Sequence, residues 1–208
     1  MSLVVDTFVG GPVQENCYVV RAERGAADAV VVDPGYEASA LRLELAGLGA
    51  RVAGILVTHT DADHVWALAE LVEGTGAEAW VPQGELEAMR TGRTRGAPVP
   101  PHDPAHVVSG GDTVTLAGIE FEVVDVPGHS AGHVAFHADG CLFSGDLLFA
   151  GSVGRVDLEG GDWDTLLASV RALLERFPPE TVVYPGHGPA TTLGDERARN
   201  PFLAELRA

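Results

Sequence analysis

Residues 58–64, Thr-His-Thr-Asp-Ala-Asp-His, place four potential metal ligands within six positions, directly after the apolar run Val52 to Val57. The four are His59, Asp61, Asp63 and His64. In an extended chain alternate side chains point the same way, so the first three can face one point, and a bend can bring the last one to it. Few structural requirements produce such a cluster, and we interpret it as a metal site.

Three later segments each place His or Asp in a Gly-rich turn after an apolar run. They are Pro127-Gly128-His129-Ser130-Ala131-Gly132-His133, Ser144-Gly145-Asp146 and Tyr184-Pro185-Gly186-His187-Gly188. Glycine lets the backbone approach an ion closely. Imidazoles and carboxylates without thiolates suit zinc, iron or manganese, which commonly polarise a substrate and activate water or oxygen. The sequence therefore indicates metal-centred chemistry.

The type and order of these four motifs resemble the metallo-β-lactamase-fold superfamily, and within it the glyoxalase II-like hydrolases, over nearly the whole chain. Their first motif is usually Thr-His-x-His-x-Asp-His, so Asp61 stands where that family has a histidine. The resemblance implies an α/β fold, the four-layer αββα sandwich. The length of 208 residues suits one domain, and we expect residues 1–208 to form a single metallo-β-lactamase-like domain.

The same resemblance implies the ligands of two metal positions. The first position takes His59, Asp61 and His129, the second takes Asp63, His64 and His187, and Asp146 bridges them. Asp63 and Asp146 would be catalytic residues as well as ligands. The implied cofactors are two divalent ions (zinc, iron or manganese), and a paired site of this kind holds its ions ~3.5–4 Å apart with a bridging water or hydroxide as the nucleophile.

Asp61 leaves two alternatives open. As a direct ligand, its carboxylate lowers the net positive charge of the site, and its harder oxygen favours iron or manganese over zinc. Because aspartate is shorter than histidine, Asp61 can instead hold a bound water, in which case only one metal binds tightly.

Three functions follow from the resemblance. The leading one is a thioester or related ester hydrolase that uses a metal-bound hydroxide, although only 21 residues follow His187, which argues against the added helical domain that helps glyoxalase II to bind glutathione. The second is a sulfur oxygenase similar to the persulfide dioxygenases, with a single iron on His59, His129 and Asp146. The third is a metal-binding relative without turnover.

The sequence also predicts roles for several other polar residues. Arg155 either pairs with Asp157 or faces an anionic substrate, and we favour the ion pair. His133 is expected to form hydrogen bonds beneath the site rather than to bind metal. The loop Thr91–Pro104 could border a substrate pocket. The arginines around its start are interpreted as a solvated group: Arg90, Arg93 and Arg95.

The amino-acid composition limits the classes of molecule that the protein is expected to bind. The chain has 30 acidic and 13 basic residues, a net charge of −17 and no lysine, which excludes Schiff-base chemistry through lysine. Such a charge repels phosphate backbones and anionic membranes, so we expect a small-molecule substrate, no nucleic acid and no membrane partner. A homodimer is possible. No signal segment or long apolar run is present, which predicts a cytoplasmic protein, and the two cysteines, Cys17 and Cys141, are expected to be buried thiols.

Hydrophobic periodicity and turn residues predict the elements that position these motifs. Strands are expected at 3–9, 17–20, 29–32, 52–57, 77–81, 107–108, 113–116, 119–124, 133–136, 141–143 and 181–184. Helices are expected at 37–48, 64–73, 84–89 and 162–177, with one or two more in 194–207. Each motif then lies on a loop at the end of a strand.

Overall fold

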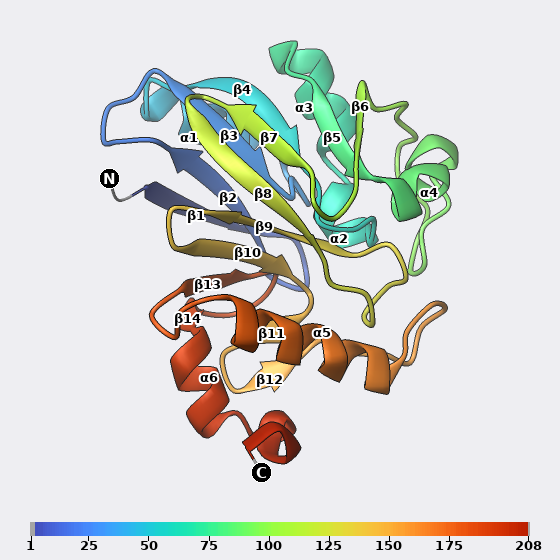
Figure 1. Ribbon diagram of the computed structural model, residues 1–208. Helices are drawn as coiled ribbons and strands as arrows, with labels where there is room; N and C mark the ends of the chain where they lie inside the picture. The colour runs from blue at the N-terminus through green and yellow to red at the C-terminus, as the bar shows by residue number, and fades with distance from the viewer. Residues whose placement is uncertain (1–2, 208) are drawn as a thin grey trace.

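Two six-stranded sheets packed face to face make up the centre of the molecule, with helices on both outer surfaces (Figure 1). This is the arrangement in the computed structural model, which describes residues 3–207. The predicted four-layer αββα sandwich is confirmed. No helix in the described part of the chain is both long and apolar enough to cross a bilayer.

The first sheet has its strands in chain order. They are β1 (Val4–Gly10), β2 (Glu15–Arg21), β3 (Asp28–Val32), β4 (Arg51–Leu56), β5 (Ala79–Pro82) and β6 (His106–Val108). The first three strands form an antiparallel meander. From β3 onwards the pairs are parallel, with helices in the connections between β3, β4 and β5.

The second sheet has the order β14-β13-β10-β9-β8-β7. Its strands are β7 (Thr113–Leu116), β8 (Ile119–Asp125), β9 (Val134–Ala138), β10 (Cys141–Gly145), β13 (Val182–Pro185) and β14 (Thr191–Thr192). A separate hairpin of β11 (Leu148–Phe149) and β12 (Ser152–Val153) follows β10. The sequence did not predict this hairpin or β14, because each strand is only two residues long and too short to show a period.

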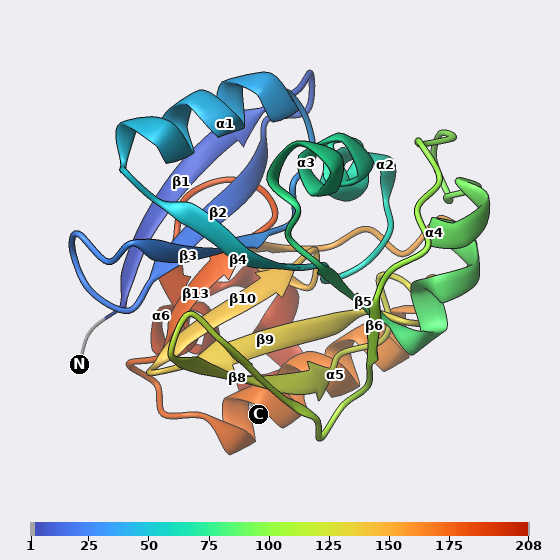
Figure 2. The same cartoon turned by 90° about the horizontal axis from the view of Figure 1, so that it is seen from above.

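Helices cover the outer face of each sheet (Figure 2). Those beside the first sheet are α1 (Ala38–Gly47), α2 (Ala62–Val65), α3 (Leu68–Thr75) and α4 (Leu86–Thr91), the last preceded by the 3₁₀ turn η1 (Gln83–Glu85). Those beside the second sheet are α5 (Trp163–Arg176), α6 (Leu193–Arg199) and the 3₁₀ segment η2 (Pro201–Arg207). The helix predicted over 64–73 is divided into α2 and α3, because the chain turns directly after the first motif.

Side chains alternate between three apolar layers, as the period of a strand requires. In β2, Cys17 and Val19 face the helices, whereas Tyr18 and Val20 face the second sheet. The middle layer contains large rings from the second sheet, and a third layer lies between that sheet and α5. Because both faces of each sheet are covered, its strands are rigid supports for the loops at their ends.

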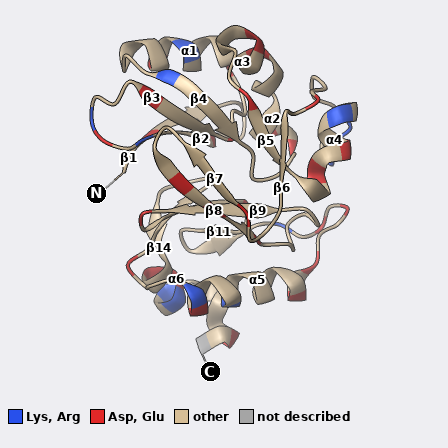
Figure 3. Ribbon diagram, turned by 45° about the horizontal axis from the view of Figure 1, so that its top comes forward, with Lys and Arg blue, Asp and Glu red and all other residues tan. Residues whose placement is uncertain are grey.

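Figure 3 shows basic stretches on α1, α4, α5 and α6, with acidic stretches among them. Arg90 pairs with Asp103, Arg51 pairs with Asp28, and both pairs are exposed. Both cysteines are buried free thiols, as predicted.

Candidate metal centre

Loops from both sheets meet at one edge of the sandwich and bring the His and Asp residues together. The loop after β4 leads into α2 and carries the first motif, and the other three motifs follow β8, β10 and β13. Three groups of described residues there have ligand atoms within 4.8 Å of one another. One joins Asp33 to His59 and His64, and the two that contain only expected ligands are His59, His129 and Asp146, and Asp63, His64 and His187. Six of the seven expected ligands belong to these two groups. Asp61 belongs to neither, although its Oδ2 is 3.1 Å from Nε2 of His129 and 3.8 Å from Nε2 of His59.

Asp146 lies between the two groups. One carboxylate oxygen, Oδ1, is 3.3 Å from Nε2 of His64, and the other, Oδ2, is 3.7 Å from Nε2 of His129 and 3.6 Å from Nε2 of His187. Asp63 completes the second group, because its Oδ2 is 3.2 Å from Nε2 of His187. A carboxylate that faces both groups has the position of a bridging ligand.

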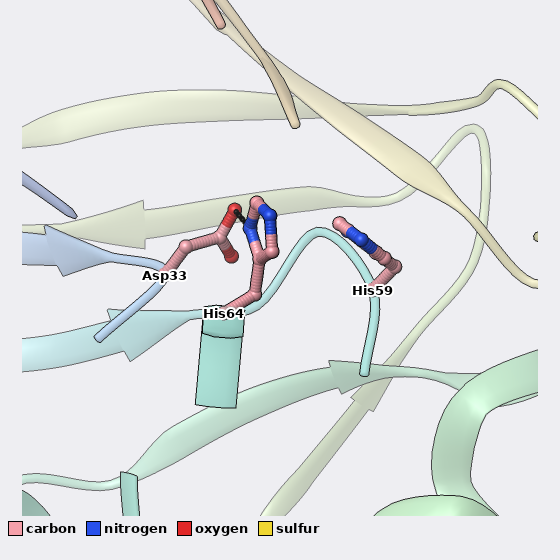
Figure 4. Close-up of side chains that lie close together, drawn as sticks. All are labelled: Asp33, His59 and His64. Carbon is pink, nitrogen blue, oxygen red and sulfur yellow. Dashed lines mark hydrogen bonds and ion pairs between the residues drawn. The ribbon is translucent and has the colours of Figure 1, made fainter. Parts of the chain in front are cut away.

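Hydrogen bonds at Nδ1 turn the Nε2 atoms of two histidines inward. Nδ1 of His129 lies 2.7 Å from the backbone oxygen of Arg155, and Nδ1 of His64 lies 3.0 Å from Oδ2 of Asp33. An imidazole that donates from Nδ1 presents the lone pair of Nε2, and such outer partners are what hold metal-binding histidines in place. The second contact is visible in Figure 4, where the ring of His59 lies beside that of His64.

Asp33 is a functional residue that the sequence interpretation missed. Its buried carboxylate accepts from the backbone N–H of Thr58 at 2.7 Å, from the Thr58 hydroxyl at 2.7 Å and from His64. Asp33 therefore fixes the start of the first motif and the ring of His64 together. The sequence held one usable signal for it, an Asp directly after the strand predicted at 29–32.

A second buried carboxylate, that of Glu85, joins two motif loops. It accepts from the hydroxyl of Thr60 at 2.5 Å and from the hydroxyl of Ser130 at 2.6 Å. Thr60 belongs to the first motif and Ser130 to the second, so Glu85 sets the distance between them. It does not belong to either group of candidate ligands.

The loop that carries His187 is held by the first sheet. The amide nitrogen of Asn16 donates to the backbone oxygens of Pro185 at 2.9 Å and Gly188 at 2.8 Å, and the Tyr18 hydroxyl donates to Pro185 at 2.5 Å. These bonds cross from one half of the sandwich to the other. The positions of the last and first motifs are therefore coupled through β2.

Asp61 pairs with Arg95, a contact that the sequence interpretation did not foresee. Nε of Arg95 is 2.8 Å from Oδ1 of Asp61, and Nη2 is 2.6 Å from Oδ2. The side chains are only 14% and 13% exposed, respectively. The interpretation of Arg95 as a solvated residue was wrong, because a carboxylate 34 positions earlier comes within its reach through the fold.

Two other expectations concern the surroundings of the site. Arg155 forms the favoured bidentate ion pair with Asp157, at 2.7 Å for both contacts, on an exposed part of the pocket rim. His133 lies beneath His59 with their rings 4.7 Å apart. Its ring nitrogens have no hydrogen-bond partner among the described residues, so the hydrogen bonds predicted for it are not seen.

The charges of the site depend on burial and on close pairs. Burial alone would raise the pKa of Asp146, but the positive charge of His64 and the closeness of the His187 and His64 imidazoles to its carboxylate hold this pKa well below the usual range. Burial keeps the pKa of His59 well below its usual value, so this imidazole is neutral. Burial would also lower the pKa of His187, yet hydrogen bonds to Asp146 and Asp63 raise it to about 9.

Several buried polar atoms at this edge have no hydrogen-bond partner in the described part of the chain, and such atoms show whether the residues fit a metal. They are Nε2 of His59, Nε2 of His64 and Oδ1 of Asp146. Leaving a buried polar atom unpaired costs about 1–3 kcal/mol, so atoms of this kind that converge usually have a ligand. The donor set of imidazoles and carboxylates suits zinc, iron or manganese. The residues fit a divalent metal centre.

Glu15 is a second buried acid beside the centre that the sequence did not reveal. It is 0% exposed, and neither carboxylate oxygen has a hydrogen-bond partner among the described residues. Burial raises its pKa well above the usual range; the positive charge of His64 opposes this rise, and the carboxylates of Asp33, Asp63 and Asp146 add to it. Its carboxyl group is therefore held in the neutral form in the metal-free protein.

Gly186 lies directly against two candidate ligands, and replacing it by alanine is expected to lower metal affinity by at least about tenfold. A Cβ there would lie 2.2 Å from Oδ1 of Asp146 and 2.5 Å from Cε1 of His64. The backbone cannot move away, because Gly186 N–H donates to Gly145 and its oxygen accepts from Asn16. Isothermal titration with Mn²⁺ measures the effect.

Gly47→Ala is the matched control for this substitution, because a Cβ at that position has nothing within 4 Å. Unchanged metal affinity in Gly186→Ala would show that the ion does not lie between Asp146 and His64.

Metal affinity is expected to rise with pH up to about 9, the pKa of His187. Below that pH the imidazole carries a proton that a metal must displace, so affinity falls by about tenfold per pH unit for each displaced proton. The stability of the metal-free protein changes with pH in the opposite direction. The His187 ion pairs stabilise its fold fully below pH ~6.5 and are lost as the pH rises through 9.

Titration at pH 7.5 in two buffers of different ionisation enthalpy counts the protons released. We expect at least one for the ion that binds at His187, and binding without proton release would contradict a role for His187 as a ligand.

A pocket of about 460 Å³ opens over the two groups. Asp61, Asp63, His129, Asp146 and His187 lie at its polar end. Its other walls are mainly apolar, and they are formed by Val13, Tyr36, Ala97, Phe149, Val153 and Leu158. Gly96 and Ala97 line this pocket, and they belong to the loop that was expected to border a substrate pocket.

Comparison with known proteins matches this geometry. Residues 10–187 match the family model of the metallo-beta-lactamase superfamily. The hydroxyacylglutathione hydrolase GloC of Haemophilus influenzae is 33% identical over 199 residues, which cover 91% of this chain and 93% of that protein.

Two solved structures are similar in both fold and sequence. The structure of TTHA1623 in a di-iron-bound form has a TM-score of 0.84 and 42% identity, and covers 96% of this chain and 100% of that one. The structure of the B3 metallo-beta-lactamase BLEG-1 has a TM-score of 0.89 and 34% identity, and covers 97% of this chain and 100% of that one. A centre with two metal positions is consistent with the di-iron-bound form of TTHA1623.

Proposed function

The chain belongs to the metallo-beta-lactamase superfamily, and from that premise we propose that it is a metallohydrolase acting on a thioester or a related ester. The observation that carries the proposal is the position of Asp146. Its Oδ1 faces His64 of one group, and its Oδ2 faces both His187 of that group and His129 of the other, at the floor of a pocket with mainly apolar walls. Such a floor suits two divalent ions, and such walls suit an acyl chain.

At a site of this kind a pair of divalent ions supplies two functions, polarisation of the ester carbonyl and activation of water. His59, His129 and Asp146 would hold one ion, and Asp63, His64, His187 and Asp146 the other. Asp63 and Asp146 remain ionised at neutral pH, since paired histidines lower the pKa of each against the opposing effect of burial. Asp63 is 21% exposed at the pocket wall, where its carboxylate can accept a hydrogen bond from the attacking water and orient it.

The pocket supports a small-molecule substrate. Its volume of about 460 Å³ accommodates an acyl group and part of a thiol carrier. Arg155 stands at the rim, and its pairing with Asp157 leaves little free charge for an anionic carrier. We therefore propose that specificity rests mainly on the acyl side. The net charge of −17 agrees with a substrate other than a nucleic acid.

One observation favours a second candidate, the sulfur oxygenase. His59, His129 and Asp146 form a face of two imidazoles and one carboxylate, which is typical of mononuclear iron oxygenases. That function would require only the first group, and the second group would then have no direct role in the reaction.

Metal reconstitution tests both functions. The metal-free protein is loaded with zinc, iron or manganese and assayed on acyl thioesters, carboxylic esters, a lactone and a β-lactam. We expect thioester cleavage that depends on metal and reaches its maximum near two ions per chain. Oxygen uptake with a persulfide and one iron per chain, without thioester cleavage, would contradict the hydrolase and support the oxygenase. Cleavage of the β-lactam alone would contradict the thioester proposal.

A further inference from the structure

Arg95 occupies a place that a metal ion would need. His129 donates from Nδ1 to the backbone oxygen of Arg155, so Nε2 is the atom that faces the centre. That same atom lies 2.8 Å from Nη2 of Arg95 and 3.1 Å from Oδ2 of Asp61. A lone pair that accepts a hydrogen bond from arginine cannot bind a metal at the same time. A protonated Nε2 that donates to Asp61 has no lone pair to offer. In either state the ion pair and a metal exclude each other at His129.

The guanidinium is held there by several bonds. It donates to both oxygens of Asp61, at 2.8 and 2.6 Å, and to the backbone oxygen of His129. The bidentate geometry is the strongest that arginine forms with a carboxylate. Asp61, the residue that replaces the usual histidine of the first motif, therefore holds an internal cation beside the first metal position.

The position of Arg95 in the fold allows it to leave. It lies at the tip of a loop whose base is closed by the bond from Val99 N–H to Gly92 and by a β-bridge between Arg93 and Pro98. The next residues, Gly96 and Ala97, are exposed and line the pocket. The tip can move outward without breaking a strand or a helix, and it would carry the guanidinium with it.

The second metal position has no cationic side chain from another part of the fold beside it, and a metal there displaces only protons of its own histidines. No arginine contacts Asp63, His64 or His187 among the described residues, and their close partners are carboxylates. We propose that Arg95, held by Asp61, is an internal competitor for the first metal position (His59, His129 and Asp146), so that this position fills after the second and more weakly. This inference rests on the proposed function, because it requires that the centre binds divalent metal.

The test is a calorimetric titration of metal-free protein with Co²⁺, with the visible absorption of bound Co²⁺ as a second readout. Wild-type protein should show two steps that differ by at least about tenfold in affinity. In Arg95→Gln the weaker step should tighten by about tenfold or more, and the tighter step should change by less than about threefold. Arg93→Gln removes one positive charge from the same loop and should behave as wild type.

Arg95→Lys separates competition from charge. Lysine keeps the charge but cannot span both oxygens of Asp61 and reach His129 together, so the weaker step should tighten here too, although less than in Arg95→Gln. Wild-type binding by this variant would overturn competition at His129.

Other outcomes separate this inference from the proposed function. A weaker or unchanged second step in Arg95→Gln would overturn the inference alone, and would make Asp61 a ligand that Arg95 orients. Wild-type protein that binds no Co²⁺ in either readout would overturn both.

Discussion

Replacing Asp146 by asparagine is expected to abolish tight binding of both metal ions and to lower kcat/KM for the thioester on the order of 10³-fold or more. Asp146 faces His64 on one side and His129 and His187 on the other, so its carboxylate contacts both groups. Asparagine keeps the shape but offers one neutral oxygen in place of two charged ones. Both positions therefore lose a ligand with a single substitution.

Metal content by elemental mass spectrometry and single-turnover kinetics on the thioester measure this effect. The control is Asp164→Asn, which removes an exposed carboxylate from the first turn of α5. The substituted protein should remain folded, because Oδ1 of Asp146 has no hydrogen-bond partner to lose. An Asp146→Asn protein that retains two ions per chain would contradict the bridging role.

Replacing Asp33 by asparagine is expected to lower affinity at the second metal position by about 10- to 100-fold, without removing any metal ligand. The carboxylate is 2% exposed and accepts from Thr58 twice and from His64 once. An amide can keep one acceptor but presents its NH₂ group to at least one donor. The ring of His64 then loses the bond that directs its Nε2 towards Asp146.

The same substitution should lower the free energy of unfolding by about 2–4 kcal/mol, as expected for losing buried hydrogen bonds to a charged group. Glu85→Gln is the matched comparison, because Glu85 is also buried and accepts from two hydroxyls, but it contacts no candidate ligand side chain. Glu85→Gln should lower the free energy of unfolding by a similar amount, while the metal affinity of the second position stays within about threefold of the wild-type value. Equal losses of affinity in both variants would show that Asp33 acts through general stability and not through His64.

The ligand residues could be recognised from the sequence because each stands in a short motif after an apolar run. The turns that carry His129, Asp146 and His187 contain glycines. At Gly186 the lack of a side chain is essential, because the site leaves no room for a Cβ there. Most strands of the two sheets could also be predicted from the sequence. Their side chains alternate between two apolar layers, which gives the strands a recognisable hydrophobic pattern.

The supporting residues could not be recognised, because their partners are distant in the sequence. Asp33 reaches His64 and Arg95 reaches Asp61 only after the sheets and loops are in place. Glu15 is the first residue of β2, and its neighbours in the sequence do not indicate that its carboxyl group is buried. They also do not indicate that it lacks a hydrogen-bond partner among the described residues. Pattern and spacing reveal what a residue type can do, whereas the pairing of a long side chain depends on the path of the whole chain.

The division of the ligands between the two sheets has a consequence for how the molecule is held together. His59, Asp63 and His64 follow a strand of the first sheet, whereas His129, Asp146 and His187 follow strands of the second. A bound ion would therefore act as a cross-link between the halves of the sandwich. Chelation should make their separation easier, and a chain cut between β6 and β7 should reassemble more readily with metal than without it. The lifetime of the folded protein would then follow the metal supply of the cell that makes it.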